Sequence, residues 1–157
     1  MKIRGLNDYD IVNYKDPTLF IAFPYCNFKC DKDYGTQIFQ NIKLIKEPMI
    51  DIANDYIFTL YDTNPLTKGI LCAGLEPFDS FNLLQEFISE FRETHSDLVI
   101  IYTGYRELEI HSKVEQLKKL GNLIIKFGRY IPNAASRYDN ILGVTLASDN
   151  QYAKYYE

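Results

Sequence analysis

The chain of 157 residues contains no tryptophan, only three cysteines and no long apolar run. No segment approaches the roughly 20 apolar residues that cross a bilayer, and the first residues lack the apolar core of a signal peptide. Three cysteines cannot build a disulfide framework. We therefore expect a cytoplasmic protein without a membrane partner, in which the thiols serve metal or redox chemistry.

An excess of positive charge is also missing, because 17 Lys and Arg residues stand against 21 Asp and Glu residues, for a net charge of -4. Nucleic-acid binding depends on a dense basic surface, so we expect no nucleic-acid partner. The hydrophobic share of 46% is sufficient for one core. We expect a single domain over residues 1–157.

Four short apolar runs rich in β-branched and aromatic residues predict strands. They are Leu19 to Phe23, Gly69 to Ala73, Leu98 to Tyr102 and Leu123 to Phe127. Helical patterns separate them, and such alternation is typical of right-handed crossovers between parallel strands. The sequence thus predicts an α/β fold with a mainly parallel sheet that is covered on both faces or curled. We expect residues 146–151 to form a loop or a short final strand.

The helical patterns have recognisable starts and stops. The first helix is expected to begin at Pro48, the second to follow Asp79 or Ser80 as cap, and the third to end at Gly121 after two lysines. Apolar residues at helical spacing are expected to face the sheet. These residues are Met49, Ile52, Ala53, Tyr56, Ile57 and Leu60; Phe81, Leu84, Phe87, Ile88 and Phe91; and Ile110, Val114, Leu117 and Leu120.

Chemically suggestive residues follow each predicted strand, where parallel sheets place their active sites. Cys26 and Cys30 follow the first strand, and two thiols at this spacing are typical of an iron–sulfur loop, although a solvent-facing remnant or a divalent-metal half-site remains an alternative. The later strands lead into Gly74-Leu75-Glu76-Pro77, Thr103-Gly104-Tyr105 and Gly128-Arg129-Tyr130.

Four motifs in this order resemble the radical S-adenosylmethionine (radical SAM) superfamily, most closely the activating proteins of anaerobic ribonucleotide reductase. The likeness runs from about Leu19 to Gln151. The matching residues are Cys26 and Cys30; Gly74, Glu76 and Pro77; Tyr102, Thr103, Gly104 and Tyr105; and Ser148, Asn150 and Gln151. The resemblance implies a parallel sheet curled as a partial (β/α) barrel.

The resemblance also implies cofactors and a partner. A 4Fe–4S cluster would be bound by the Cys26 and Cys30 loop, and S-adenosylmethionine by Gly74, Glu76, Pro77, Thr103 and Gly104. The protein partner would be a glycyl-radical enzyme or a related protein.

The third cysteine of the family's loop is absent. Its position falls on Asp33 at the shorter spacing and on Tyr34 at the longer one, and both are oxygen donors, which suit a sulfide-rich cluster less well than thiolate. Cys72, two residues before Gly74, is either a packed core thiol or an alternative ligand.

The absence of the third cysteine leaves two possible functions. The first is a degenerate radical-SAM-like protein that keeps the fold and acts through a partner or a residual cofactor pocket. The alternative is an active enzyme that uses the cluster and S-adenosylmethionine to generate a glycyl radical on a partner. Of the other polar residues, we expect His95 and His111 on the surface and Asp79 as a helix cap, and we expect Arg129 and Arg137 to flank a loop that contacts a partner.

Overall fold

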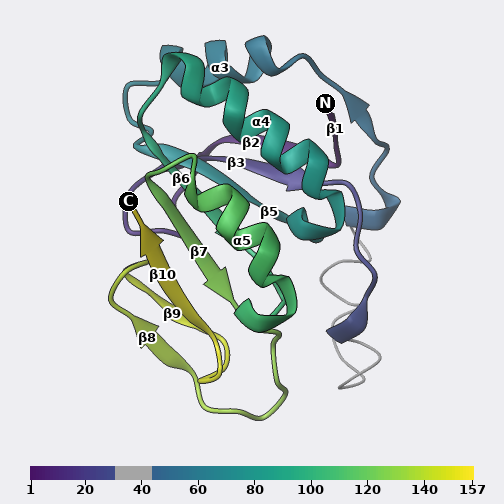
Figure 1. Cartoon of the computed structure of the whole chain (residues 1–157), viewed down its shortest axis with the longest axis vertical. Helices are drawn as coiled ribbons and strands as arrows, with labels where there is room; N and C mark the ends of the chain where they lie inside the picture. The colour runs from purple at the N-terminus through teal and green to yellow at the C-terminus, as the bar shows by residue number, and fades with distance from the viewer. Residues whose placement is uncertain (31–43) are drawn as a thin grey trace.

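The computed structural model describes residues 1–30 and 44–157, and it shows an α/β fold built on one six-stranded sheet (Figure 1). The strand order is β10-β7-β6-β5-β3-β2. The bounds are β2 Gly5–Asp10, β3 Thr18–Phe23, β5 Gly69–Gly74, β6 Leu98–Tyr102, β7 Leu123–Phe127 and β10 Tyr152–Tyr156. The inner strands β3, β5, β6 and β7 are parallel and confirm the four strands predicted from the apolar runs.

The two edge strands are antiparallel to their neighbours, so the sheet is mixed. β2 pairs with β3, and β10 pairs with β7. The last strand lies beyond residues 146–151, which contribute only the end of a short strand and a loop. Within the part of the chain that the structure describes, the sheet is open and no closed barrel forms.

Two small antiparallel sheets complete the strand content of the described residues. β1 (Lys2–Ile3) pairs with β4 (Ile50–Asp51), and β8 (Arg137–Asp139) pairs with β9 (Val144–Leu146). The first links the N-terminus to the segment before α3, and the second forms a hairpin beside β10 (Figure 1).

Helices α3 (Asn54–Thr63), α4 (Phe81–Thr94) and α5 (His111–Lys118) pack on one face of the sheet. Short 3-10 helices, η1 (Pro77–Ser80) and η2 (Glu107–Ile110), lead into α4 and α5. Four predicted inward residues of α4 are confirmed, since Leu84, Phe87, Ile88 and Phe91 are fully buried, and the fifth, Phe81, is partly buried against the same core. In α5, Val114 and Leu117 are buried, and Gly121 ends the segment with a positive φ of 65°.

The first helix begins at Asn54, so the prediction that it begins at Pro48 is wrong. The reason is a long-range contact, because residues 50–51 pair with β1 and the N–H of Ile52 donates to the carbonyl of Met1. Of the residues predicted to face the sheet, Met49, Ala53 and Tyr56 are exposed, whereas Ile57 is buried as expected.

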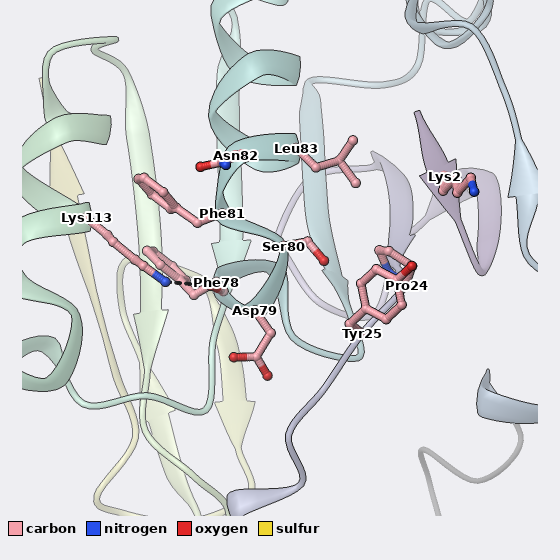
Figure 2. A pocket seen from close by; sticks show the side chains of 10 residues that line it. All are labelled: Lys2, Pro24, Tyr25, Phe78, Asp79, Ser80, Phe81, Asn82, Leu83 and Lys113. Atoms are coloured by element: carbon pink, nitrogen blue, oxygen red, sulfur yellow. Dashed lines mark hydrogen bonds between the residues drawn. The ribbon is translucent and has the colours of Figure 1, made fainter.

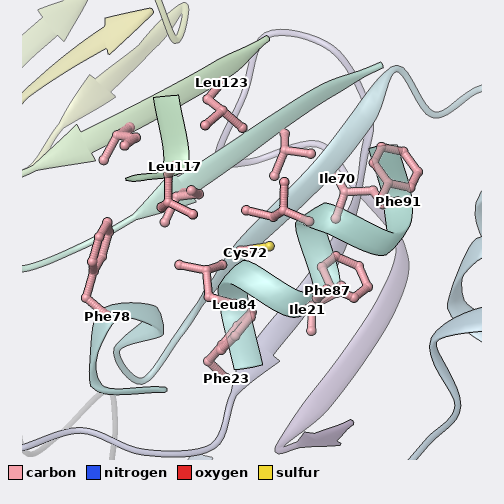
Figure 3. Packing of buried hydrophobic residues seen from close by; sticks show 14 of the residues in the cluster. Ile21, Phe23, Ile70, Cys72, Phe78, Leu84, Phe87, Phe91, Leu117 and Leu123 are labelled. Atoms are coloured by element: carbon pink, nitrogen blue, oxygen red, sulfur yellow. The ribbon is translucent and has the colours of Figure 1, made fainter. Parts of the chain in front are cut away.

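Alternation along the strands separates two apolar clusters. The helix-facing cluster contains Ile21 and Cys72 (Figure 3), together with Ile101 and Ile125. The opposite cluster contains Leu71, Ala73, Ile100 and Ile124 from the same strands, together with Leu142 and Leu146 from the hairpin region. The hairpin covers only part of this second face, and the candidate site lies on the same face.

Gly74 at the end of β5 fixes how closely two strands approach at the site. Its φ is +89°, and a Cβ added there would lie 2.6 Å from Cα of Ala22 in β3. Only glycine tolerates both conditions. No helix among the described residues combines the length and the apolar character needed to span a membrane.

Candidate functional site

A pocket of about 410 Å³ opens where the parallel strands end, on the face opposite the helices. It brings together most of the residues predicted for the site, because Cys26, Cys30, Gly74, Glu76, Thr103 and Gly104 all line it. Pro77 does not line the pocket and instead occupies the first position of η1, where its fixed φ supports the turn.

The Cys26–Cys30 loop is held in an unusual backbone conformation. Phe28, midway between the cysteines, has a φ of +53°, a region that bulky side chains rarely occupy. Its N–H donates to Sγ of Cys26 at 3.3 Å, and hydrogen bonds to sulfur tune iron–sulfur clusters. Burial raises the pKa of the Cys26 thiol to about 11, so a bound metal must displace its proton.

Glu76 is a buried carboxylate that ties together the turns after β5 and β6. Its Oε1 accepts from the Phe78 N–H at 3.0 Å and from the Thr103 hydroxyl at 2.8 Å, and its Oε2 accepts from the Gly104 N–H at 2.8 Å. Burial raises the pKa of Glu76 to about 7, although these hydrogen bonds oppose the shift. Glu76 therefore shapes the pocket wall that Thr103 and Gly104 form.

Lys126 on β7 is a buried cation on the same pocket wall, 8% exposed. Its Nζ donates to the carbonyl of Gly128 at 3.1 Å and lies 5.6 Å from the ring centre of Tyr102. Burial lowers the pKa of Lys126 to about 8, and the charge of Glu76 opposes this shift. The sequence analysis missed this residue because it lies inside an apolar run.

The late motif of the resemblance also reaches the pocket. Gln151 lines it and donates through Nε2 to the carbonyl of Gly128 at 3.1 Å. Asn150 donates to the carbonyl of Arg129 at 2.8 Å, and Ser148 accepts from the N–H of Ile131. These bonds fix the turn after β7, so this motif shapes the wall next to Lys126.

Several single-residue predictions require correction. Asp79 does not cap α4, because its carboxylate accepts from the Asn27 N–H at 2.7 Å and from the Tyr105 hydroxyl at 2.6 Å. Ser80, the other predicted cap, is the N-cap residue of α4, although its side chain makes no capping hydrogen bond. Arg129 is buried and forms an ion pair with Glu109 at 2.8 Å rather than lying open on a loop.

The two histidines differ in their surroundings. His111 is exposed, as predicted. His95 is half-buried, because its ring stacks on Phe91 with centroids 4.4 Å apart and its Nε2 lies 2.7 Å from Asp62. Its role is therefore one of packing at the end of α4. Arg137 is exposed on β8, and its predicted contact with a partner stays a prediction.

Cys72 belongs to the helix-facing core and not to the pocket. It is fully buried beside Leu84 and Phe87 (Figure 3). Burial in this apolar cluster raises the pKa of its thiol strongly. The structure therefore favours the packed core thiol over the alternative ligand. Every cysteine of the chain lies among the described residues, so Cys26 and Cys30 are the two thiols that this chain brings to the pocket.

The third ligand position is predicted to fall on Asp33 or Tyr34. Asp33 and Tyr34 both lie outside the described residues, and their roles stay predictions. Among residues 1–30 and 44–157, no group of three or more His, Cys, Asp or Glu side chains is arranged to hold a metal ion.

A larger pocket of about 550 Å³ lies next to Tyr25, between β1 and the start of α4 (Figure 2). Its lining includes Lys2, Phe81 and Lys113, and Lys113 donates to the carbonyl of Phe78 at 2.9 Å. Neither cysteine lines this pocket, and neither do Glu76 or Gly104. The pocket beside the two thiols is therefore the better candidate.

Comparison with protein families supports the iron–sulfur interpretation of the cysteine loop. The model of the 4Fe-4S single cluster domain family matches residues 17–151, which include the inner strands and every pocket residue except Asn13. The chain belongs to this family. Comparisons with curated proteins and with solved structures returned no match.

The family implies a 4Fe–4S cluster, and the donors of this chain fit it in part. Two thiols line the pocket, and thiolates are the usual ligands of such clusters. A third thiolate cannot come from this chain, since Cys72 faces the helices. Asp33 and Tyr34 stay the predicted positions for a further protein ligand.

Proposed function

We propose that this protein is a degenerate radical-SAM-like domain that keeps an S-adenosylmethionine pocket beside a two-thiolate iron–sulfur site. The observation that carries the proposal is the shared pocket of about 410 Å³, which joins both thiols to the turns after β5 and β6. A protein that had lost one cysteine of its cluster loop, but had kept its binding site for a small molecule, would keep such a pocket.

The pocket wall has chemistry suited to the parts of S-adenosylmethionine. Phe20, Tyr102 and Tyr130 offer aromatic surface for an adenine ring. Lys126 offers a buried positive charge for the carboxylate, and Gly74 allows a ligand to approach the backbone closely. Residues from elements that are distant in the sequence therefore form one pocket, which suits a ligand with both apolar and charged parts.

A bound cluster would supply electrons to a ligand in the pocket. The chain's own residues perform three tasks around it. Cys26 and Cys30 would provide sulfur ligands, Glu76 orients Thr103 and Gly104 along the pocket wall, and Lys126 adds a positive charge to the same wall. The resulting arrangement would position a ligand next to the thiols.

Anaerobic reconstitution and calorimetry test this proposal together. Wild-type protein treated with iron and sulfide is expected to retain iron, and S-adenosylmethionine is expected to bind with measurable heat. Cys26→Ser and Cys30→Ser should lower the iron content, whereas the matched Cys72→Ala should not, because Cys72 lies on the other face of the sheet. Absence of any heat or thermal shift with S-adenosylmethionine would contradict the proposal.

The second candidate is an active activating enzyme that generates a glycyl radical on a partner such as anaerobic ribonucleotide reductase. The family match favours it, because the match implies a bound cluster. Release of 5′-deoxyadenosine from S-adenosylmethionine in the presence of a strong reductant is its signature. A reconstituted protein that binds S-adenosylmethionine without cleaving it supports the degenerate domain instead.

A further inference from the structure

The residues between the two cysteines are tied to other loops of the protein. Asn27 contacts Asp79 and Tyr105, and Lys29 contacts Glu109. We name these five residues the loop clasp. They come from the loops after β3, β5 and β6, so the clasp joins three neighbouring carboxyl ends of the sheet.

The first arm of the clasp is a closed ring of hydrogen bonds. The Asn27 N–H donates to Oδ2 of Asp79 at 2.7 Å, and the Tyr105 hydroxyl donates to Oδ1 of the same carboxylate at 2.6 Å. Nδ2 of Asn27 in turn donates to the Tyr105 hydroxyl at 2.5 Å. Each of these three donors therefore has an acceptor within the ring. Hydrogen bonds to a charged carboxylate are stronger than those between neutral groups.

The second arm is an ion-pair chain. Nζ of Lys29 lies 2.8 Å from Oε1 of Glu109, and Arg129 donates to both oxygens of that carboxylate at 2.8 and 3.2 Å. Partial burial alone would raise the pKa of Glu109, but hydrogen bonds from Arg129 and Lys29 lower this pKa to about 2. The Glu109 carboxylate is therefore charged at neutral pH. The Arg129 guanidinium also lies 5.2 Å from the ring centre of Tyr105, which joins the two arms.

The loop between the arms carries strain that these contacts sustain. Phe28 lies between Asn27 and Lys29 with its φ of +53°, and the Lys29 N–H donates to Oδ1 of Asn27 at 2.9 Å. A strained backbone persists only where its surroundings over-determine it. Here the surroundings consist of side chains of the protein itself. Of these hydrogen bonds, only the one from the Phe28 N–H to Sγ of Cys26 involves a predicted metal ligand.

We propose that the loop clasp holds Cys26 and Cys30 towards the pocket before any cluster is bound, and so supplies the order that a third thiolate would otherwise impose. Asp79 and Tyr105 are then positioning residues for the thiols. The part of this inference that concerns iron rests on the proposed function. The part that concerns the order of the loop does not.

Thiol alkylation in the metal-free protein tests the clasp directly. Tyr105→Phe removes one hydroxyl and keeps the ring under Arg129. The matched control is Tyr156→Phe, which removes a hydroxyl that donates at 3.1 Å to Glu107, a residue outside the five residues of the clasp. We expect iodoacetamide to modify Cys26 and Cys30 at least about tenfold faster in Tyr105→Phe, because one charge-assisted hydrogen bond is lost. Mass spectrometry assigns each thiol, with buried Cys72 as the internal reference.

Lys29→Met tests the second arm in the same assay. Its control is Lys118→Met, which breaks an exposed pair with Glu115 of similar length, 2.9 Å. Equal alkylation rates in Tyr105→Phe, Lys29→Met and their two controls would overturn the proposal. Faster alkylation in both clasp variants, with unchanged melting temperatures, would support it.

Iron retention and ligand binding then separate the clasp from the proposed function. If the clasp orders the thiols for a cluster, reconstituted Tyr105→Phe should lose iron to a chelator faster than Tyr156→Phe and show a weaker absorbance near 400 nm. Binding of S-adenosylmethionine reports on the pocket independently. Fast alkylation in the clasp variants without S-adenosylmethionine binding in any variant would sustain the clasp and overturn the proposed function.

Discussion

Glu76 and Lys126 are buried, oppositely charged side chains on the wall of the same pocket. Glu76 projects from the turn after β5 and Lys126 from β7, with β6 between these two strands. Burial moves both pKa values towards neutrality, to about 7 for Glu76 and about 8 for Lys126. The charge of the pocket therefore changes within the range of ordinary buffers.

Glu76 should make the protein less stable as the pH rises from about 4.5 to about 7. Over this range the folded protein keeps the carboxyl proton that the unfolded chain has released, so folding takes up a proton. The slope is at most about 1.4 kcal/mol per pH unit for one group. Urea unfolding at pH 5 and 7.5 measures it, and Glu76→Gln should lose this part of the slope. An unchanged slope in the variant would contradict the assignment.

If the pocket binds S-adenosylmethionine as proposed, Lys126→Met should weaken that binding by about tenfold or more, because the charge-assisted hydrogen bond proposed between Lys126 and the ligand carboxylate would be lost. 5′-Methylthioadenosine is the matched ligand, since it lacks the carboxylate. Its affinity should stay within about twofold of the wild-type value, as the variant keeps the side-chain volume. Calorimetric titration measures both affinities, and an equal loss for the two ligands would refute a specific role for the charge.

Gly74→Ala should destabilise the protein by about 2–3 kcal/mol or more, because it combines a positive φ with an overlap against the backbone of β3. The added Cβ would lie 2.6 Å from Cα of Ala22. Gly5→Ala is the control, because its Cβ would meet the same residue at an ordinary 3.6 Å. Urea unfolding curves of the two variants give the comparison, and similar midpoints would show that β3 and β5 can separate without cost.

A restored thiolate should increase the iron content. We expect either Asp33→Cys or Tyr34→Cys, but not both, to bring the reconstituted protein towards about four irons per chain. Asp31→Cys serves as the control, since its spacing matches neither form of the family's loop. Iron and sulfide analysis with electron paramagnetic resonance gives the result. If neither variant gains iron, the third position of the loop lies elsewhere.

The inner part of the fold could be predicted because its strands are buried on both faces. Such strands are apolar nearly throughout and need no neighbour to be recognised. Strand β2 could not be predicted, because it lies at the edge of the sheet and its sequence, Gly-Leu-Asn-Asp-Tyr-Asp, is mostly polar. The start of α3 depends on the pairing of β1 with β4, which joins residues about 48 positions apart, and local patterns carry no such information.

The site was predictable where a residue belongs to a short sequence motif that indicates its role. Cys26, Gly74 and Thr103 each stand in a short recognisable stretch, and the parallel sheet brings these stretches together. Asp79 was not predictable, because its position before α4 matches a cap while its partners lie 52 and 26 residues away. Lys126 was hidden for the opposite reason, since the apolar residues around it predict only a strand.

The direction of Cys72 has a consequence for how this chain could evolve or be engineered. To turn its sulfur towards the pocket, β5 would have to slide by one residue against β3 and β6. The slide would carry Ile70 to the hairpin side of the sheet and Leu71 to the helix side, which exchanges the two cores. A third sulfur is therefore far easier to gain by one substitution in the cysteine loop than by recruiting the thiol already present.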